Sequence, residues 1–102
     1  MPPSHVLDQP PPPPGSAVRV SVEGRAIAVF NIGPSLYAID AACTHVRAPL
    51  EKGRVEGGVV TCPWHGSQFD LRTGEVRRGP ASQSVKTYAV RIENQKLVVE
   101  IP

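Results

Sequence analysis

Two short groups of cysteine and histidine constrain the fold of this 102-residue chain more than any other feature. The first group is Cys43-Thr44-His45 and the second is Cys62-Pro63-Trp64-His65, with sixteen residues between them. Each group combines one thiolate ligand with one imidazole, so together they could hold zinc or an iron–sulfur centre. A chain with this pattern is expected to bring two loops together at one metal site.

The spacing within the two groups helps to separate the alternatives. A usual zinc knuckle has paired cysteines in its first half, whereas here each half contributes one Cys and one His. If both cysteines bind one iron and both histidines bind the other, each loop supplies a ligand to each metal, which is the arrangement of a Rieske centre. A structural zinc-binding module is therefore a weaker alternative. A disulfide between Cys43 and Cys62 is also weaker, because each cysteine precedes a histidine at ligand spacing.

Short runs of alternating apolar and polar residues predict strands on both sides of the two groups. Valine alternates with polar residues over 18–22, as a half-buried strand requires. Residues 26–32 are apolar enough for a strand that is partly covered on both faces. The expected strands are 18–22, 26–32, 36–39, 87–92 and 97–101, with tight turns at Gly24 and at Asn94-Gln95.

No window has the apolar spacing of a long helix, and Gly and Pro interrupt the chain often. The sequence therefore predicts an all-β domain, a small antiparallel sandwich or barrel. Residues 41–81, between the first three strands and the C-terminal hairpin, are expected to be loop-rich. This middle segment contains both cysteines, so we interpret it as an inserted subdomain that carries the function.

The N-terminal residues differ in composition from the rest of the chain. Seven of the twelve prolines lie within the first fifteen residues, and five of them follow one another at 10–14. Such a run favours a stiff polyproline II segment that cannot donate to a sheet. We expect a flexible lead-in over 1–14 and one folded domain over 15–102.

Charge and hydropathy exclude several classes of function. The net charge is only +2, and Lys and Arg are scattered along the chain, so nucleic-acid binding is not indicated. No run of eighteen apolar residues occurs, and the N-terminus lacks the basic and apolar regions of a secretory signal. We expect a cytoplasmic protein without a membrane anchor.

From residue 13 onward the pattern resembles the Rieske iron–sulfur domain family. The family motif is C-x-H, a gap of roughly sixteen residues, and then C-x-x-H. The likeness is greatest to the soluble Rieske ferredoxins that supply ring-hydroxylating oxygenases, and it extends beyond the ligands. The matching stretches are 36–40, 48–50, 62–70 and 79–81.

This resemblance implies one [2Fe–2S] cluster per chain, in a loop-rich subdomain inserted into a Rieske-like β-sandwich or barrel. Histidine ligation would raise the reduction potential above that of plant-type ferredoxins. The implied role is electron transfer without catalysis, from a flavin-containing reductase to a terminal oxygenase, by a monomeric carrier. The implied ligands are Cys43, His45, Cys62 and His65.

Residues beside the ligands are further candidates for the site. By resemblance, Ser67 donates a hydrogen bond to a cluster sulfide and Pro80 belongs to a loop that covers the cluster; the alternatives are a solvent-facing serine and an ordinary surface turn. Arg47 stands where the family usually has glycine, so either the first loop follows a different path or Arg47 points outward and contributes to partner docking. The candidates around the ligands are Arg47, Trp64, Gly66, Ser67 and Pro80.

Two enzyme roles are alternatives to the carrier role. A Rieske oxygenase also needs a mononuclear iron bound by two histidines and a carboxylate, but beyond His45 and His65 the chain has only His5. A small subunit of assimilatory nitrite reductase would agree in size and fold. Such subunits often lack the cluster ligands, and all four are present here, which favours the carrier.

Overall fold

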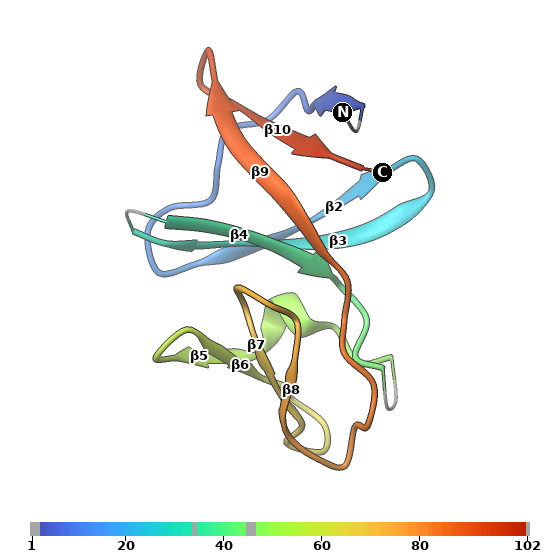
Figure 1. Ribbon diagram of the computed structural model, residues 1–102. Coiled ribbons are helices and arrows are strands. Elements are labelled where there is room, and N and C mark those ends of the chain that lie inside the picture. Colours follow the sequence, from blue (N-terminus) through green and yellow to red (C-terminus); the bar gives the residue numbers. More distant parts are fainter. Residues whose placement is uncertain (1–2, 34, 45–46, 102) are drawn as a thin grey trace.

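The protein is an all-β structure of two antiparallel sheets, described in a computed structural model for residues 3–33, 35–44 and 47–101 (Figure 1). The larger sheet has the strand order β1-β10-β9-β4-β3-β2. Its strands are β1 (Ser4–Val6), β2 (Ala17–Val22), β3 (Arg25–Ile32), β4 (Ser35–Asp40), β9 (Thr87–Glu93) and β10 (Lys96–Glu100). The predicted all-β class and the five strands expected outside the middle segment are confirmed.

Two tight turns set the register of the larger sheet. Glu23 and Gly24 join β2 to β3, with φ of 52° and 76°. Asn94 and Gln95 join β9 to β10, with φ of 51° and 66°. A two-residue turn with positive φ at both positions matches the right-handed twist of the strands that it connects. Both turns lie where the sequence predicts them.

Strand β3 is covered on both faces, as its apolar sequence predicts. Ile27 and Val29 pack into a cluster enclosed by the larger sheet, together with Leu97 of β10. Ala28 and Phe30 point to the other side, into a second cluster that contains both cysteines. Side chains of a strand alternate between its faces, so β3 forms a wall shared by the two halves of the core.

The middle segment contains more regular structure than the sequence indicates. Figure 1 shows that the chain leaves the larger sheet at the end of β4, forms the lower subdomain and returns into β9. This subdomain has a second sheet, β5 (Arg54–Glu56), β6 (Val59–Thr61), β7 (Gln68–Asp70) and β8 (Val76–Arg78), and a 3₁₀ turn, η1 (Leu50–Lys52). Each strand has three residues, too few to display an alternating pattern. The described residues contain no helix long and apolar enough to span a bilayer.

The N-terminal segment also differs from the expected lead-in. Strand β1 pairs with the edge of β10, where His5 lies opposite Val99. The proline run then packs against β3, where the side-chain amide of Asn31 donates to the carbonyl oxygen of Pro12 at 2.8 Å. The run offers carbonyl acceptors to its neighbours, although its prolines have no N–H to donate. The segment before residue 15 therefore adds an edge strand to the domain.

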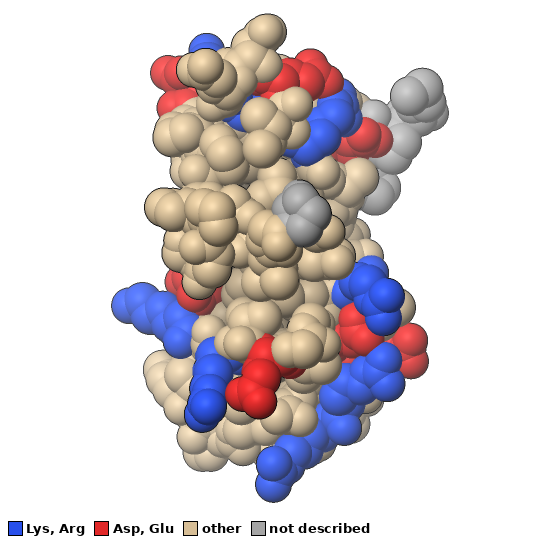
Figure 2. Space-filling view, turned by 90° about the vertical axis from the view of Figure 1, so that its left-hand side faces the viewer, with Lys and Arg blue, Asp and Glu red and all other residues tan. Residues whose placement is uncertain are grey.

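The molecule is elongated, with principal extents of 39 × 26 × 19 Å. The larger sheet occupies one end of the long axis and the inserted subdomain occupies the other (Figure 1). On the face drawn in Figure 2, charged side chains gather over both ends, and the middle is formed mainly by uncharged residues. The inserted subdomain thus projects away from the larger sheet.

Candidate metal centre

The two cysteines lie at the ends of two loops in the inserted subdomain. Cys43 follows β4, and Cys62 follows β6. Both belong to the same buried core cluster, with 1% and 2% of their surface exposed, and neither forms a disulfide. Two free buried thiols beside histidine-containing loops are a donor set that fits a Rieske-type cluster.

The two loops have the same backbone hydrogen bonding. In the first loop, the amide of Arg47 donates to the carbonyl of Cys43 at 2.8 Å, and the amide of Cys43 donates to the carbonyl of Ala48 at 3.0 Å. In the second, Gly66 donates to Cys62 at 3.2 Å, and Cys62 donates to Ser67 at 2.7 Å. Each loop is closed between a cysteine and the residues four and five positions later. Two unrelated turns would not share this pattern, so the loops present their cysteines in equivalent ways.

This equivalence explains the position of Arg47. Arg47 has a φ of 59°, and Gly66, at the same place in the second loop, has a φ of 78°. Left-handed backbone costs a non-glycine residue about 1–2 kcal/mol. The first loop therefore keeps the path that glycine would give it, and the exposed side chain of Arg47 extends from its surface. Of the two alternatives derived from the sequence, the structure favours the outward-pointing arginine.

Of the two candidate histidine ligands, the structure describes His65. His45 lies outside the described residues, so its place as a ligand stays a prediction. His65 is exposed, and so is its neighbour Trp64, with 62% of its surface accessible. Within residues 3–33, 35–44 and 47–101, no three His, Cys, Asp or Glu side chains form a group that could hold a metal ion. The set of four ligands therefore stays a prediction.

A third loop, at 79–83, is tied to both cysteine loops. The amide of Ala81 donates to the side-chain oxygen of Ser67 at 3.0 Å, and the hydroxyl of Thr44 donates to the carbonyl of Gln83 at 2.7 Å. Pro80, between these ties, is exposed. Ser67 is fully buried, so it is not a serine that faces solvent. Neither hydrogen bond could be predicted from a local sequence pattern, because the partners are 14 and 39 residues apart.

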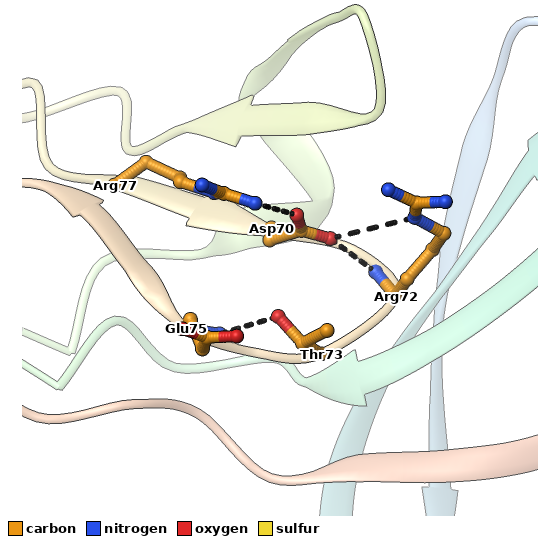
Figure 3. A network of polar contacts seen from close by, with 5 residues as sticks. All are labelled: Asp70, Arg72, Thr73, Glu75 and Arg77. Carbon is orange, nitrogen blue, oxygen red and sulfur yellow. Dashed lines mark hydrogen bonds and ion pairs between the residues drawn. The ribbon is translucent and has the colours of Figure 1, made fainter.

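A buried carboxylate organises the turn between β7 and β8 (Figure 3). Asp70 accepts hydrogen bonds from the guanidinium of Arg77 at 2.6 Å and from the amide of Arg72 at 2.8 Å. These bonds, with Arg77 as the largest contribution, hold the pKa of Asp70 below its ordinary value of 3.8. Asp70 thus caps the amide of Arg72 and pairs with Arg77, and the sequence did not indicate this pairing.

Asp40 occupies the point where the chain enters the first loop. It accepts a hydrogen bond from the hydroxyl of Tyr88 at 2.6 Å and another from the amide of Lys86 at 3.4 Å. Burial is the main cause that raises the pKa of Tyr88, and the bond to Asp40 adds to it. These contacts join the end of β4 to the start of β9, the two connections between the subdomain and the larger sheet.

Comparison with known proteins agrees with this geometry. The model of the Rieske [2Fe-2S] domain family matches residues 5–89. The ferredoxin component of a naphthalene 1,2-dioxygenase system from Pseudomonas aeruginosa is 37% identical over 89 residues, which are 87% of this chain and 86% of that protein.

Solved structures of related ferredoxins superpose on the whole domain. The ferredoxin of carbazole 1,9a-dioxygenase from Nocardioides aromaticivorans IC177 has a TM-score of 0.80 and 31% identity, over 85% of this chain and 86% of that one. A ferredoxin in complex with the oxygenase of carbazole 1,9a-dioxygenase has a TM-score of 0.79 and 31% identity, over 86% and 82%. A nitrite reductase small subunit, at 20% identity and a TM-score of 0.71 over 86% and 88%, shares the fold.

Proposed function

Because this chain belongs to the Rieske [2Fe-2S] domain family, we propose that it is the ferredoxin component of a ring-hydroxylating dioxygenase system. In this role the protein accepts one electron from a flavin-containing reductase and delivers it to a terminal oxygenase. It acts in the cytoplasm as a monomeric carrier and does not itself transform the organic substrate.

The observation that carries this proposal is the pair of matched loops that each begin at a buried cysteine with a free thiol. We assign Cys43 and Cys62 as ligands of one iron, and His45 and His65 as ligands of the other. When bound, the cluster supplies reversible one-electron chemistry at a potential raised by its imidazole ligands. The chain has no need of a catalytic base, since no covalent bond of a substrate changes on it.

The candidate site has a buried side and an exposed side. Cys43, Cys62 and Ser67 are buried, which keeps the thiol side of the site away from water. His65 and Trp64 are exposed, so the imidazole side faces a partner. A short path through an exposed imidazole suits outer-sphere electron transfer, and a small docking face allows the rapid dissociation that a carrier needs.

Two other candidates from the sequence receive less support. The likeness to a nitrite reductase small subunit is at 20% identity and concerns the fold alone. The dioxygenase ferredoxins are more similar in sequence and match nearly their whole length. A structural zinc module would use the same thiols, and chemical analysis distinguishes it from an iron–sulfur protein.

The proposal is tested on purified protein by iron, zinc and acid-labile sulfide analysis and by electron paramagnetic resonance after reduction. We expect two irons and two sulfides per chain and a Rieske-type signal. Separate His45→Ala and His65→Ala variants should lose that signal, whereas His5→Ala, which changes the third histidine, should keep it. Zinc without sulfide would contradict the cluster, and an unchanged signal in either ligand variant would contradict the ligand assignment.

A further inference from the structure

The positive charge of the protein is concentrated in the inserted subdomain. Residues 41–81 contain six Lys and Arg against four Asp and Glu, whereas the rest of the chain has five of each. Three segments around the candidate site, 43–50, 62–69 and 76–85, contain no acidic residue, although Glu51, Asp70 and Glu75 directly adjoin them. Of these neighbours, Glu51 pairs with Arg19 and Asp70 pairs with Arg77. The basic residues of the three segments are Arg47, Arg77 and Arg78.

Arg47 supplies a charge that the fold of its loop does not require. It is exposed, its backbone is left-handed, and within the described part of the chain it forms no ion pair. At the equivalent position of the second loop, Gly66 has the same backbone region. A strained exposed residue with no structural partner is a candidate for a functional contact.

Arg78 brings a second charge to the same end of the molecule. It is exposed, it ends β8, and it lies opposite Gln68 in the sheet, next to the loop of Cys62. No described carboxylate forms an ion pair with it. Arg77 differs, because Asp70 binds its guanidinium. Figure 2 shows basic side chains extending along the lower end of the molecule, the end formed by the inserted subdomain.

We propose that this end is a cationic docking surface, made of Arg47, Arg78 and the exposed Trp64, that selects an acidic surface on the oxygenase. The inference rests on the proposed function and adds the chemistry of the partner to it. Trp64 provides an apolar contact of the kind that is enriched at interface centres, and the two arginines come from the first cysteine loop and from the end of β8. Charges of this kind mainly accelerate the encounter and exclude partners of the wrong sign, and salt screens them.

The surface charge is measured with small outer-sphere oxidants of opposite sign. The reduced protein is mixed in a stopped-flow instrument with the anionic cobalt(III)–EDTA complex or the cationic tris(1,10-phenanthroline)cobalt(III) ion, at increasing ionic strength. We expect salt to slow oxidation by the anion and to accelerate oxidation by the cation. Poly-L-glutamate serves as a model of an acidic protein surface. By covering the basic residues it should slow oxidation by the anionic complex more than poly-L-lysine does.

Three variants assign the effect to this end of the molecule. Arg47→Gly keeps a residue that tolerates the left-handed loop, and Arg78→Gln removes the second charge. Each should lower the rate with the anionic oxidant by about twofold at low ionic strength. Lys96→Gln removes the same charge from the β9–β10 hairpin, at the opposite end in Figure 1, and should leave both rates unchanged.

The possible results separate this inference from the proposed function. A salt dependence of the opposite sign, or arginine variants that behave like Lys96→Gln, would overturn the cationic docking surface and leave the carrier role intact. Protein that contains no iron and sulfide would overturn both.

Discussion

The side-chain oxygen of Ser67 accepts a hydrogen bond from the backbone amide of Ala81, at 3.0 Å, and so ties the second cysteine loop to the proline loop. Both residues are buried. Because the oxygen acts as acceptor in this bond, the hydroxyl hydrogen of Ser67 stays available for donation toward the candidate metal site. One serine could thus position a loop and adjust the electrostatics of the site.

Replacing Ser67 with alanine should affect both roles. The amide of Ala81 would lose its acceptor in a buried place, which should lower the free energy of unfolding by about 1–3 kcal/mol. Loss of a hydrogen bond worth about 1 kcal/mol to a cluster sulfide should lower the reduction potential by roughly 40 mV. Denaturant unfolding and a redox titration measure the two effects. Ser82→Ala, at an exposed neighbour, is the control, and a potential equal to that of Ser82→Ala would remove Ser67 from the electrostatics of the cluster.

Gly74 tests how closely the β7–β8 turn packs against the segment that leads into β9. Its amide donates to Asp70, and its carbonyl accepts from the amide of Val85. A Cβ added there would collide with the carbonyl oxygen of Val85, whereas a Cβ at Gly58 would meet nothing within 4 Å. The two glycines have φ of 78° and 77°, so both alanine variants carry the same backbone strain.

Gly74→Ala should therefore destabilise the protein by about 1–3 kcal/mol more than Gly58→Ala does. Thermal unfolding of the two variants beside the parent protein measures this difference. Equal stabilities would mean that the turn can move away from Val85 at no cost.

The sequence predicted the long strands because their side-chain pattern is long enough to be visible. Strand β3 has eight residues and β9 has seven, and each spans several alternations. The strands β1 and β5 to β8 have three residues each and were not predicted. Pairing with neighbours defines such strands, and a single sequence does not display that pairing.

The candidate site was also predicted only where a local sequence pattern marks it. The spacing of the cysteines and histidines indicated the two loops, because a metal site imposes a local pattern of residues. The ties from Thr44 to Gln83 and from Ala81 to Ser67 bring together distant segments, and no local pattern marks them. The sequence predicted two alternatives for Arg47, and the positive φ that Arg47 shares with Gly66 favours the one in which its side chain points outward.

Asp70 should make the stability of the protein depend on acid pH. Its pKa is lowered in the folded state below 3.8 by the bonds from Arg77 and Arg72, so the folded protein binds its proton more weakly than the unfolded chain does. The resulting stabilisation is fully present above the unfolded pKa and is lost as the pH falls through the lower, folded pKa. Asp70→Asn should cost about 1–3 kcal/mol near neutral pH, and the difference from the parent protein should shrink as the pH is lowered below 3.8. Urea unfolding across this range measures that difference. Asp8→Asn, where the carboxylate is 97% exposed, should follow the parent protein at every pH, and a constant penalty for Asp70→Asn would show that packing, not the charge of Asp70, stabilises the turn.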